Sequence, residues 1–496
     1  MKLPNFFCAA TLLLMSSVTH AAPSIALANR LAELPEARLP AAAVRQQIGA
    51  LKHQPLRFAV PAALNLDQRN GAWDTNAAGL ARWRLRIESE GASSLALLLT
   101  DVQLPEGATL WFYDTAGHDV QGPFDRHSAG LIEGRLQLPL VRSSTAVLEV
   151  LSPIEHSTTI AFRISEAYHG YRDFSAAGNT SKATPGAGNS GSCNVDVICA
   201  AGNAWRNEIR STVLLTIDSQ AVCSGTLMNN TRRDDRALIL TANHCEIRSE
   251  NISDVRAYFN VQSSSCGGNQ DGIVTQNIPA SAFLARDDKS DFTLFTLDSR
   301  PPSTYNVFYA GWDAQNVAPK CGVAIHHPVG DEKKISTYKT AGVAENDVLI
   351  GEANDSFRVD AWRITWTNGT TETGSSGGGL FNQNRQLIGM LSGGSASCGA
   401  NEKEPDFFGR LERAWLANNA ANGQLKAHLD PINSGCLQLL GKNMGATTPI
   451  ASCDVVAVDT TTCNDATGGG AVGLSLLEAF LLLALHRRKR KITADT

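Results

Sequence analysis

The sequence lacks an excess of basic residues, a closely spaced cysteine pair and long helix-forming segments. Lys and Arg number 43 against 48 Asp and Glu, so the formal net charge of the 496-residue chain is −5. Nucleic-acid-binding proteins need a basic face, so this balance argues against a nucleic-acid partner. No Cys-x-x-Cys pair occurs, and we therefore expect neither a zinc cluster nor another cofactor.

Short apolar runs take the place of helical patterns. Runs of Val, Leu, Ile and Thr, punctuated by Gly, Asn and Ser, recur along the chain. Such runs are typical of strands joined by turns, so we predict a mostly β protein. At roughly 150 residues per domain, the length allows two or three domains that can each bury a core.

The cysteines are unevenly placed. Of the 11 cysteines, Cys8 lies near the N-terminus and all the others follow residue 190. The first 22 residues combine Lys2, an apolar stretch and small residues at Ala21 and Ala22, which is the pattern of a cleaved Sec-type signal peptide. We therefore expect the Sec machinery and signal peptidase as partners, a secreted or cell-surface protein, and disulfides after residue 190.

Residues 23–173 carry no cysteine and no catalytic cluster. We expect one or two short helices over 23–55, followed by regularly spaced short strands typical of a β-sandwich. A prodomain that assists folding is our interpretation, and substrate binding is the alternative. Residues 174–192 are rich in Ala, Gly, Ser, Thr and Asn and indicate an exposed processing linker.

The cysteine-bearing domain covers residues 193–441, and residues 442–467 form an irregular spacer. In the tail, 468–496, three glycines precede an apolar run over 471–485 and a basic cluster. At about 1.5 Å per residue the run is shorter than a ~30 Å hydrocarbon core, so it is a marginal transmembrane helix. The tail resembles the GlyGly-CTERM sorting tails of Gram-negative bacteria, which a rhomboid-type sortase processes; a simple tail anchor in the inner membrane is the alternative.

Three motifs together indicate nucleophilic catalysis. Ser376 lies in the glycine-rich turn Glu372–Leu380, His244 follows an apolar strand beside Cys245, and Asp291 opens another apolar strand. A serine hydroxyl needs a base and a group that orients the base. Taken singly, these residues fit a flexible loop, a structural histidine and a turn aspartate. Their order along the chain is that of the chymotrypsin-like double β-barrel proteases.

The domain resembles the bacterial lysyl endopeptidases over nearly all of residues 188–440. The resemblance is carried by the segments Ser190–Val197, Thr241–Cys245, Ser290–Leu294, Ala310–Asp313, Ile325–Pro328, Thr371–Gly377 and Asp406–Arg410. It implies a chymotrypsin-like double β-barrel after a β-sandwich-like prodomain.

The resemblance also assigns roles to the motif residues. It makes His244 the general base, Asp291 its orienting group and Ser376 the nucleophile, with the N–H groups of Gly374 and Ser376 as the oxyanion hole. The substrate-binding residues would be Thr371, Ser392, Gly393, Gly394 and Asp406, whose carboxylate would lie at the base of the pocket for the residue before the scissile bond. That pocket favours Lys, with Lys or Arg as the alternative, and a structural pair with Arg410 is the other interpretation of Asp406.

The resemblance further implies the disulfides Cys193–Cys398, Cys199–Cys266 and Cys223–Cys245. We expect Cys321–Cys436 and Cys453–Cys463 as additional pairs. The chain departs from the family at Ser392, where the lysyl enzymes carry a histidine. It also shows no counterpart, between Gly342 and Phe357, of the tryptophan near their catalytic histidine.

The sequence thus predicts a secreted serine endopeptidase precursor that cleaves protein or peptide substrates after basic residues, preferentially Lys. Maturation is expected within residues 174–192, and Lys182–Ala183 is a candidate self-processing bond. A non-catalytic surface adhesin on a protease scaffold is the competing class. His326 and His327 are adjacent, but the string Ile325–Pro328 recurs in the family without a metal, so we expect no metal there.

Overall fold

The computed structural model describes residues 33–39, 54–128, 130–172, 190–267, 272–352, 355–399, 404–418, 420–445 and 453. The predicted signal peptide, nearly all of the processing linker, and the sorting tail lie outside these residues. Within them, no helix is long and apolar enough to cross a membrane.

The N-terminal region is a sandwich of two sheets. One sheet contains β1 (Glu36–Arg38), β4 (Ala72–Thr75), β5 (Ala81–Glu88), β7 (Thr109–Asp114), β8 (Val120–Phe124) and β11 (Thr145–Ser152), and the other contains β3 (Ala59–Asp67), β6 (Ser94–Gln103), β9 (Leu131–Ile132), β10 (Arg135–Gln137) and β12 (Ala161–Gly170). Alternate residues of these strands bury side chains such as Trp83, Leu97, Leu110 and Leu148 in one apolar core. Two short 3-10 helices, η2 (Gln68–Asn70) and η3 (Ile154–Thr159), lie at strand ends.

The helices expected over residues 23–55 need a correction where the structure describes that stretch. Glu36–Arg38 forms the strand β1, which pairs in parallel with Arg86–Glu88 of β5. Pro35 precedes this strand and Pro40 follows it closely, and the residue before a proline is biased away from helical backbone angles. Residues 23–32 and 40–53 lie outside the described part of the chain.

We call the cysteine-bearing domain, which carries the three predicted catalytic motifs, the catalytic domain. Its first half is a closed barrel. It contains β14 (Thr212–Ile217), β15 (Ala221–Met228), β16 (Leu238–Ala242), β17 (Val255–Tyr258), β18 (Asn277–Asp287) and β19 (Phe292–Leu297). The order is β14-β17-β18-β19-β16-β15, and pairing of β14 with β15 closes the ring. The barrel encloses side chains such as Leu215, Leu227, Ile239 and Phe295.

The second half is built on a ten-stranded sheet. Its strands are β13 (Val195–Asp196), β21 (Trp312–Asp313), β22 (Gly322–His326), β23 (Lys334–Tyr338), β24 (Val343–Glu352), β25 (Asp355–Ile364), β26 (Gly379–Asn382), β27 (Leu387–Gly394), β28 (Asp406–Arg410) and β29 (Gln438–Leu439). A separate two-stranded sheet pairs β20 (Phe308–Tyr309) with β30 (Lys442–Asn443). The mostly β fold predicted from the sequence is confirmed.

Helices are short and peripheral in the described part of the catalytic domain. They are α2 (Arg206–Ile209), α3 (Leu411–Trp415), α4 (Lys426–Leu429) and the 3-10 turns η4 (Ala200–Trp205), η5 (Asn243–Cys245), η6 (Ile252–Asp254), η7 (Ser303–Tyr305), η8 (Pro328–Gly330) and η9 (Ala421–Gly423). The strands, not the helices, therefore position the site.

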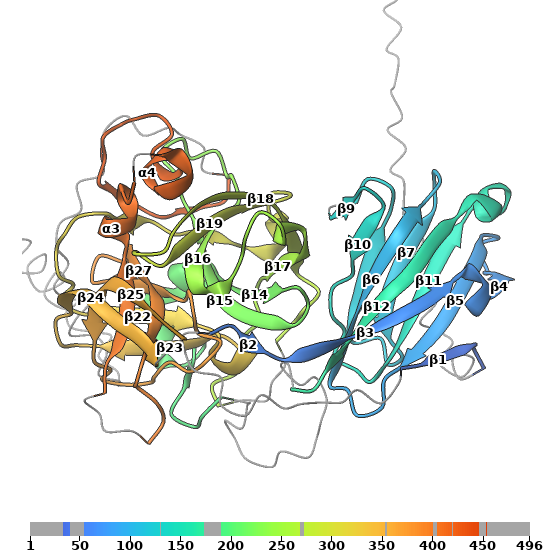
Figure 1. Ribbon diagram of the computed structural model, residues 1–496, viewed down its shortest axis with the longest axis horizontal. Coiled ribbons are helices and arrows are strands. Elements are labelled where there is room, and N and C mark those ends of the chain that lie inside the picture. The colour runs from blue at the N-terminus through green and yellow to red at the C-terminus, as the bar shows by residue number, and fades with distance from the viewer. Residues whose placement is uncertain are drawn as a thin grey trace, which may run out of the picture.

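The N-terminal sandwich packs directly against the first barrel, and β2 (Leu56–Arg57) reaches across to it (Figure 1). An apolar cluster joins the two parts, with Leu56, Phe58 and Leu140 on one side and Val222 and Tyr258 on the other. Apolar burial of this kind is the main favourable term in association, so the two parts form one packed unit.

The structure contains the disulfides Cys193–Cys398, Cys199–Cys266 and Cys223–Cys245. It joins Cys436 to Cys453, with Cα atoms 5.2 Å apart, in place of the expected Cys321–Cys436 and Cys453–Cys463 pairs, which are corrected here. Cys321 is also disulfide-bonded. The cause of the difference is long-range: β29 and β30 dock on β21 and β20, and this docking fixes where the chain runs after Cys436.

Candidate active site

His244 and Asp291 form a buried couple at the end of two paired strands. His244 follows β16 and Asp291 precedes β19, and these strands pair so that Ala242 lies opposite Phe292. The imidazole Nδ1 lies 2.9 Å from Asp291 Oδ2, and the His244 N–H donates to Oδ1 at 3.0 Å. The side chains are 7% and 1% exposed. The carboxylate therefore fixes the ring with Nδ1 as the donor and Nε2 as the position that can accept a proton.

Ser376 lies beside this couple on the other half of the domain. It is fully buried, and its carbonyl accepts a hydrogen bond from the N–H of Ser224 in β15 at 2.8 Å. The sulfur of Cys245, the residue after His244, lies 3.8 Å from the same carbonyl. The disulfide Cys223–Cys245 ties β15 to η5 at this point. The serine turn and the histidine turn are thus held against one another.

Two peptide units of the serine turn have fixed orientations. The Thr373 carbonyl accepts from the N–H of Val329 at 2.6 Å, and the Ser375 carbonyl accepts from the N–H of Gly378 at 2.8 Å. In a trans peptide the N–H points opposite to its carbonyl, so the N–H groups of Gly374 and Ser376 point away from these contacts. Donors held in advance in this way can stabilise developing negative charge.

Gly374 is required in this turn by its backbone and its surroundings. Its φ is +94°, and a Cβ there would lie 3.0 Å from the backbone nitrogens of Val329 and Gly330. Its carbonyl accepts from Ser224 Oγ at 3.1 Å. A side chain at this position would displace the turn from its support.

Buried polar side chains form hydrogen bonds that support the serine turn. His326 Nδ1 lies 2.8 Å from Ser375 Oγ, and His326 Nε2 lies 3.1 Å from Ser336 Oγ. Both ring nitrogens are therefore used in hydrogen bonds. The neighbouring His327 is buried against Lys333, and burial lowers the pKa of its imidazole well below the usual range, so this ring is neutral.

Asp406 is the first residue of β28, in the second half of the domain. It is fully buried, and its Oδ2 accepts from Trp366 Nε1 at 2.7 Å and from Thr371 Oγ1 at 2.7 Å. Arg410 is not its partner: the Arg410 guanidinium donates to Asn346 Oδ1 at 2.6 Å and lies over the Trp362 ring. The structure thus places Thr371 and Asp406 together and does not form the pair with Arg410 that was the alternative from the sequence.

Ser392, Gly393 and Gly394 form the end of β27, next to Asp406. Gly394 lies opposite Asp406 in the sheet, and a Cβ on Gly394 would lie 2.3 Å from Asp406 Oδ1. Ser392 is fully buried, and its hydroxyl makes no hydrogen bond among the described residues. Gly394 therefore leaves room for the carboxylate, which a side chain at this position would displace.

Phe357 is a site residue that sequence reasoning missed. It lies on β25, and its ring stacks on His244 with centroids 5.4 Å apart and an interplanar angle of 22°. The sequence shows only an aromatic residue in a strand, at the limit of the Gly342–Phe357 segment in which no tryptophan counterpart was found. A search for any aromatic ring, not tryptophan alone, would have identified it as a candidate.

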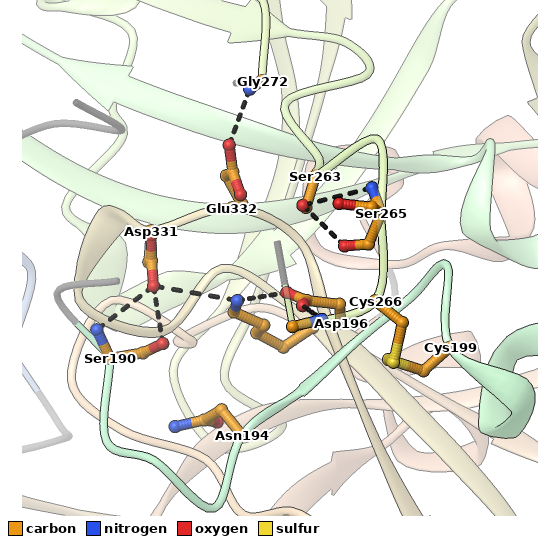
Figure 2. Close-up of polar contacts among 12 residues, drawn as sticks. Ser190, Asn194, Asp196, Cys199, Ser263, Ser265, Cys266, Gly272, Asp331 and Glu332 are labelled. Carbon is orange, nitrogen blue, oxygen red and sulfur yellow. Dashed lines mark hydrogen bonds and ion pairs between the residues drawn. A yellow bond between two sulfur atoms is a disulfide. The ribbon is translucent and has the colours of Figure 1, made fainter. Parts of the chain in front are cut away.

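The segment that begins the catalytic domain is anchored near the serine turn. Ser190 donates through its N–H and its hydroxyl to Asp331 Oδ2 at 3.1 and 2.6 Å (Figure 2). The Gly191 N–H and the Asn194 side chain donate to Glu372 Oε2 at 3.0 and 2.7 Å. The Glu372 carbonyl accepts from the Ser375 N–H at 2.9 Å, so this segment contacts the turn through one side chain.

Comparison with known proteins finds a family match over this part of the chain. The family described as "Lysyl endopeptidase, C-terminal domain" matches residues 187–409. A lysyl endopeptidase of Pseudomonas aeruginosa is 28% identical over 384 residues, which are 71% of this chain and 77% of that protein.

Solved structures give weaker similarities. The active form of the Mycobacterium tuberculosis protease Rv3671c is 16% identical and covers 52% of this chain and 89% of its own, with a TM-score of 0.31. A variant of the HtrA-type protease AlgW, solved with a tripeptide, is 15% identical and covers 43% of this chain and 60% of its own, with a TM-score of 0.28. The sequence matches are therefore the informative ones. The chain is a serine endopeptidase whose catalytic domain is similar to the lysyl endopeptidases.

Proposed function

We propose that the protein is a secreted endopeptidase that hydrolyses the peptide bond after lysine, with His244, Asp291 and Ser376 as its catalytic residues. The observation that carries this proposal is the buried Asp406 carboxylate, which lies in the same half of the domain as the serine turn. A buried carboxylate attracts a cationic side chain strongly, because few water molecules compete for it.

The steps follow from the positions of the three residues. His244 Nε2 is buried and makes no hydrogen bond among the described residues, while Asp291 holds the other ring nitrogen. Nε2 takes the proton of the Ser376 hydroxyl as the serine oxygen attacks the scissile carbonyl. The N–H groups of Gly374 and Ser376 bind the resulting oxyanion. His244 then passes the proton to the leaving amine, and water releases the acyl group by the reverse sequence.

The hydrogen bonds of Asp406 favour lysine over arginine. Its Oδ2 already accepts two hydrogen bonds, from Trp366 and Thr371. A guanidinium binds a carboxylate best through two parallel hydrogen bonds, one to each oxygen. A lysine ammonium is a point charge and needs one oxygen only. Because Oδ2 already accepts two hydrogen bonds, Asp406 is poorly placed to bind a guanidinium through both oxygens. A lysine side chain, which needs one oxygen, is therefore favoured.

The proposal includes export and maturation. The signal peptide pattern and the disulfides of the catalytic domain support an oxidising compartment outside the cytoplasm. The N-terminal sandwich is the prodomain, cut from the catalytic domain within residues 174–192, and the C-terminal tail directs sorting at the cell surface.

The test uses peptides that differ only in the residue before the scissile bond, which is Lys, Arg or Gln. The full chain is expressed, allowed to mature, and compared with its Ser376→Ala variant. We expect cleavage after Lys to exceed cleavage after Arg at least tenfold, and no cleavage by the variant. Equal cleavage after Lys and Arg would show a broader trypsin-like enzyme, and activity in the Ser376→Ala variant would reject the mechanism.

A further inference from the structure

Strand β2 belongs to the N-terminal region but pairs with the first residues of β15, a part of that strand with which β16 does not pair. It pairs antiparallel with β15, with Leu56 opposite Val222 and Arg57 opposite Ala221. The N–H of Phe58 also donates to the Gln220 carbonyl at 2.8 Å. An extended segment that adds to a sheet edge through main-chain hydrogen bonds binds as a peptide ligand does.

The chain direction of β2 matches that of the substrate residues that follow the scissile bond. Further along β15, the N–H of Ser224 donates to the carbonyl of Ser376. Because β2 is antiparallel to β15, residues before Leu56 lie toward Ser376 and residues after it lead away. The chain that follows a scissile bond runs in this direction, while the residue before the bond belongs at Asp406.

A cavity beside the catalytic histidine supports this placement. It has a volume of about 370 Å³, and His244, Cys245 and Phe357 line it together with Gln54, Pro55 and Arg57 of the N-terminal region. The N-terminal segment therefore occupies the leaving-group side of the active site, which we call the departing side.

Two arginines of the N-terminal region lie near two carboxylates on the departing side. Arg57 lines the cavity together with Asp218, but its guanidinium donates to Gln220 Oε1 at 3.5 Å and forms no ion pair with Asp218. Arg135 forms an ion pair with Asp254, with Nη2 2.9 Å from Oδ2. The N–H of Asp218 donates to the Asp254 carbonyl at 3.0 Å, so the two acidic residues are adjacent.

The other charges around the cavity leave it acidic once the N-terminal region departs. The carboxylates of Glu246 and Asp355 line it, and Gln54 Nε2 donates to Asp355. The cation that the catalytic domain itself contributes to the lining is Arg248. Its guanidinium is directed to the carbonyls of Asn243 and Ile247.

The surroundings of Asp218 disfavour the negative charge of its carboxylate. Burial raises the pKa of its carboxyl and the charge of Asp254 raises it further, while a hydrogen bond from the Asn251 side chain and the charges of Arg57 and Arg135 act in the opposite direction. Removing both arginines leaves two neighbouring carboxylates with unfavourable mutual repulsion, which a cationic ligand would relieve.

We propose that Asp218 and Asp254 form a binding site for an arginine or lysine side chain on the departing side of the substrate, and that Arg135, through its ion pair with Asp254, occupies this site in the precursor. The site adds a second basic preference to cleavage: lysine before the scissile bond, and a basic residue a few positions after it. This inference rests on the proposed function, because it concerns the same reaction.

The test is a set of peptides with lysine before the scissile bond and Arg, Gln or Glu placed in turn at each of the next four positions. We expect kcat/KM for Arg to exceed that for Gln by about threefold to tenfold at one or two adjacent positions, with Glu below Gln. The preference should shrink in high salt, which screens partly exposed charges. The salt series needs no variant and so does not depend on mutant folding.

Asp218→Asn, which keeps the shape of the side chain, should abolish the preference while cleavage of the Gln peptides is retained. Asp298→Asn is the matched control, because Asp298 is an exposed carboxylate of the same domain outside the cavity. Equal rates for Arg, Gln and Glu at every position, or a preference that survives Asp218→Asn, would overturn the inference alone. Failure to cleave after lysine in any peptide would overturn the proposed function and this inference with it.

Discussion

Replacing Asp406 by Asn tests the lysine pocket most directly. The wild-type carboxylate is fully buried and accepts from Trp366 Nε1 and Thr371 Oγ1 on the same oxygen. In Asp406→Asn, only the amide oxygen can accept from these two donors. The amide NH₂ must then take the other position and face the substrate ammonium. The substitution therefore both removes the negative charge and presents a donor to a cation.

The magnitude follows from leaving a buried cation without its partner, which costs about 3–5 kcal/mol. Since about 1.4 kcal/mol corresponds to tenfold in rate, kcat/KM for lysine peptides should fall by about 10² to 10⁴. A peptide with Gln before the scissile bond carries no charge, so its slow cleavage should be unchanged or faster. Steady-state kinetics on both peptides, with active sites titrated, measures the two effects separately.

Thr371→Val is the matched control for this prediction. It removes one hydrogen bond to Asp406 and keeps the carboxylate, so we expect a loss of about 1 kcal/mol, or roughly fivefold. A loss of less than tenfold in Asp406→Asn, or equal losses for the lysine and Gln peptides, would contradict the assignment of Asp406 as the specificity residue.

Three further predictions follow from other parts of the structure. Phe357→Ala removes the ring stacked on His244, and kcat should fall about threefold to tenfold while Phe357→Trp retains activity, which peptide kinetics would show. Replacing Cys223 and Cys245 by Ser opens a loop with a sequence separation of 22 and should lower the free energy of unfolding by about 3 kcal/mol, measurable by denaturant titration. Burial lowers the pKa of the Lys333 amine from 10.5 to about 7, so the folded state holds fewer protons than the unfolded state between these values. Stability should therefore rise with pH across that window, and Lys333→Met should flatten the rise; an unchanged slope would contradict it.

The sequence singles out candidate site residues, but it says little about their environment. Ser376, His244 and Asp291 stand in local patterns, each at the end or start of an apolar strand, and such patterns can be read from neighbours in the chain. Phe357 could not be identified in this way, because its contact with His244 depends on how the β24–β25 hairpin folds over the first barrel. Long-range packing of this kind leaves no local signal.

The same limit explains the other differences. The pairing of Cys436 with Cys453 depends on where β29 and β30 dock, and the strand β1 depends on its pairing with β5. The addition of β2 to the barrel joins segments that are distant in the sequence and is fixed by apolar packing between domains. Each of these features is decided by tertiary contacts that override local preference.

The anchoring of residues 190–194 bears on how the enzyme would be kept latent. Ser190, Gly191 and Asn194 reach Asp331 and Glu372 while still joined to the N-terminal region, so the serine turn is already supported in the uncut chain. None of these contacts uses a free α-amino group. Cleavage at any bond before Ser190 would therefore leave the conformation of the serine turn unchanged. Mature chains that begin at different residues should be equally active. If β2 obstructs the departing side in the precursor, as we propose, activity should appear when that strand leaves, not when the linker is cut.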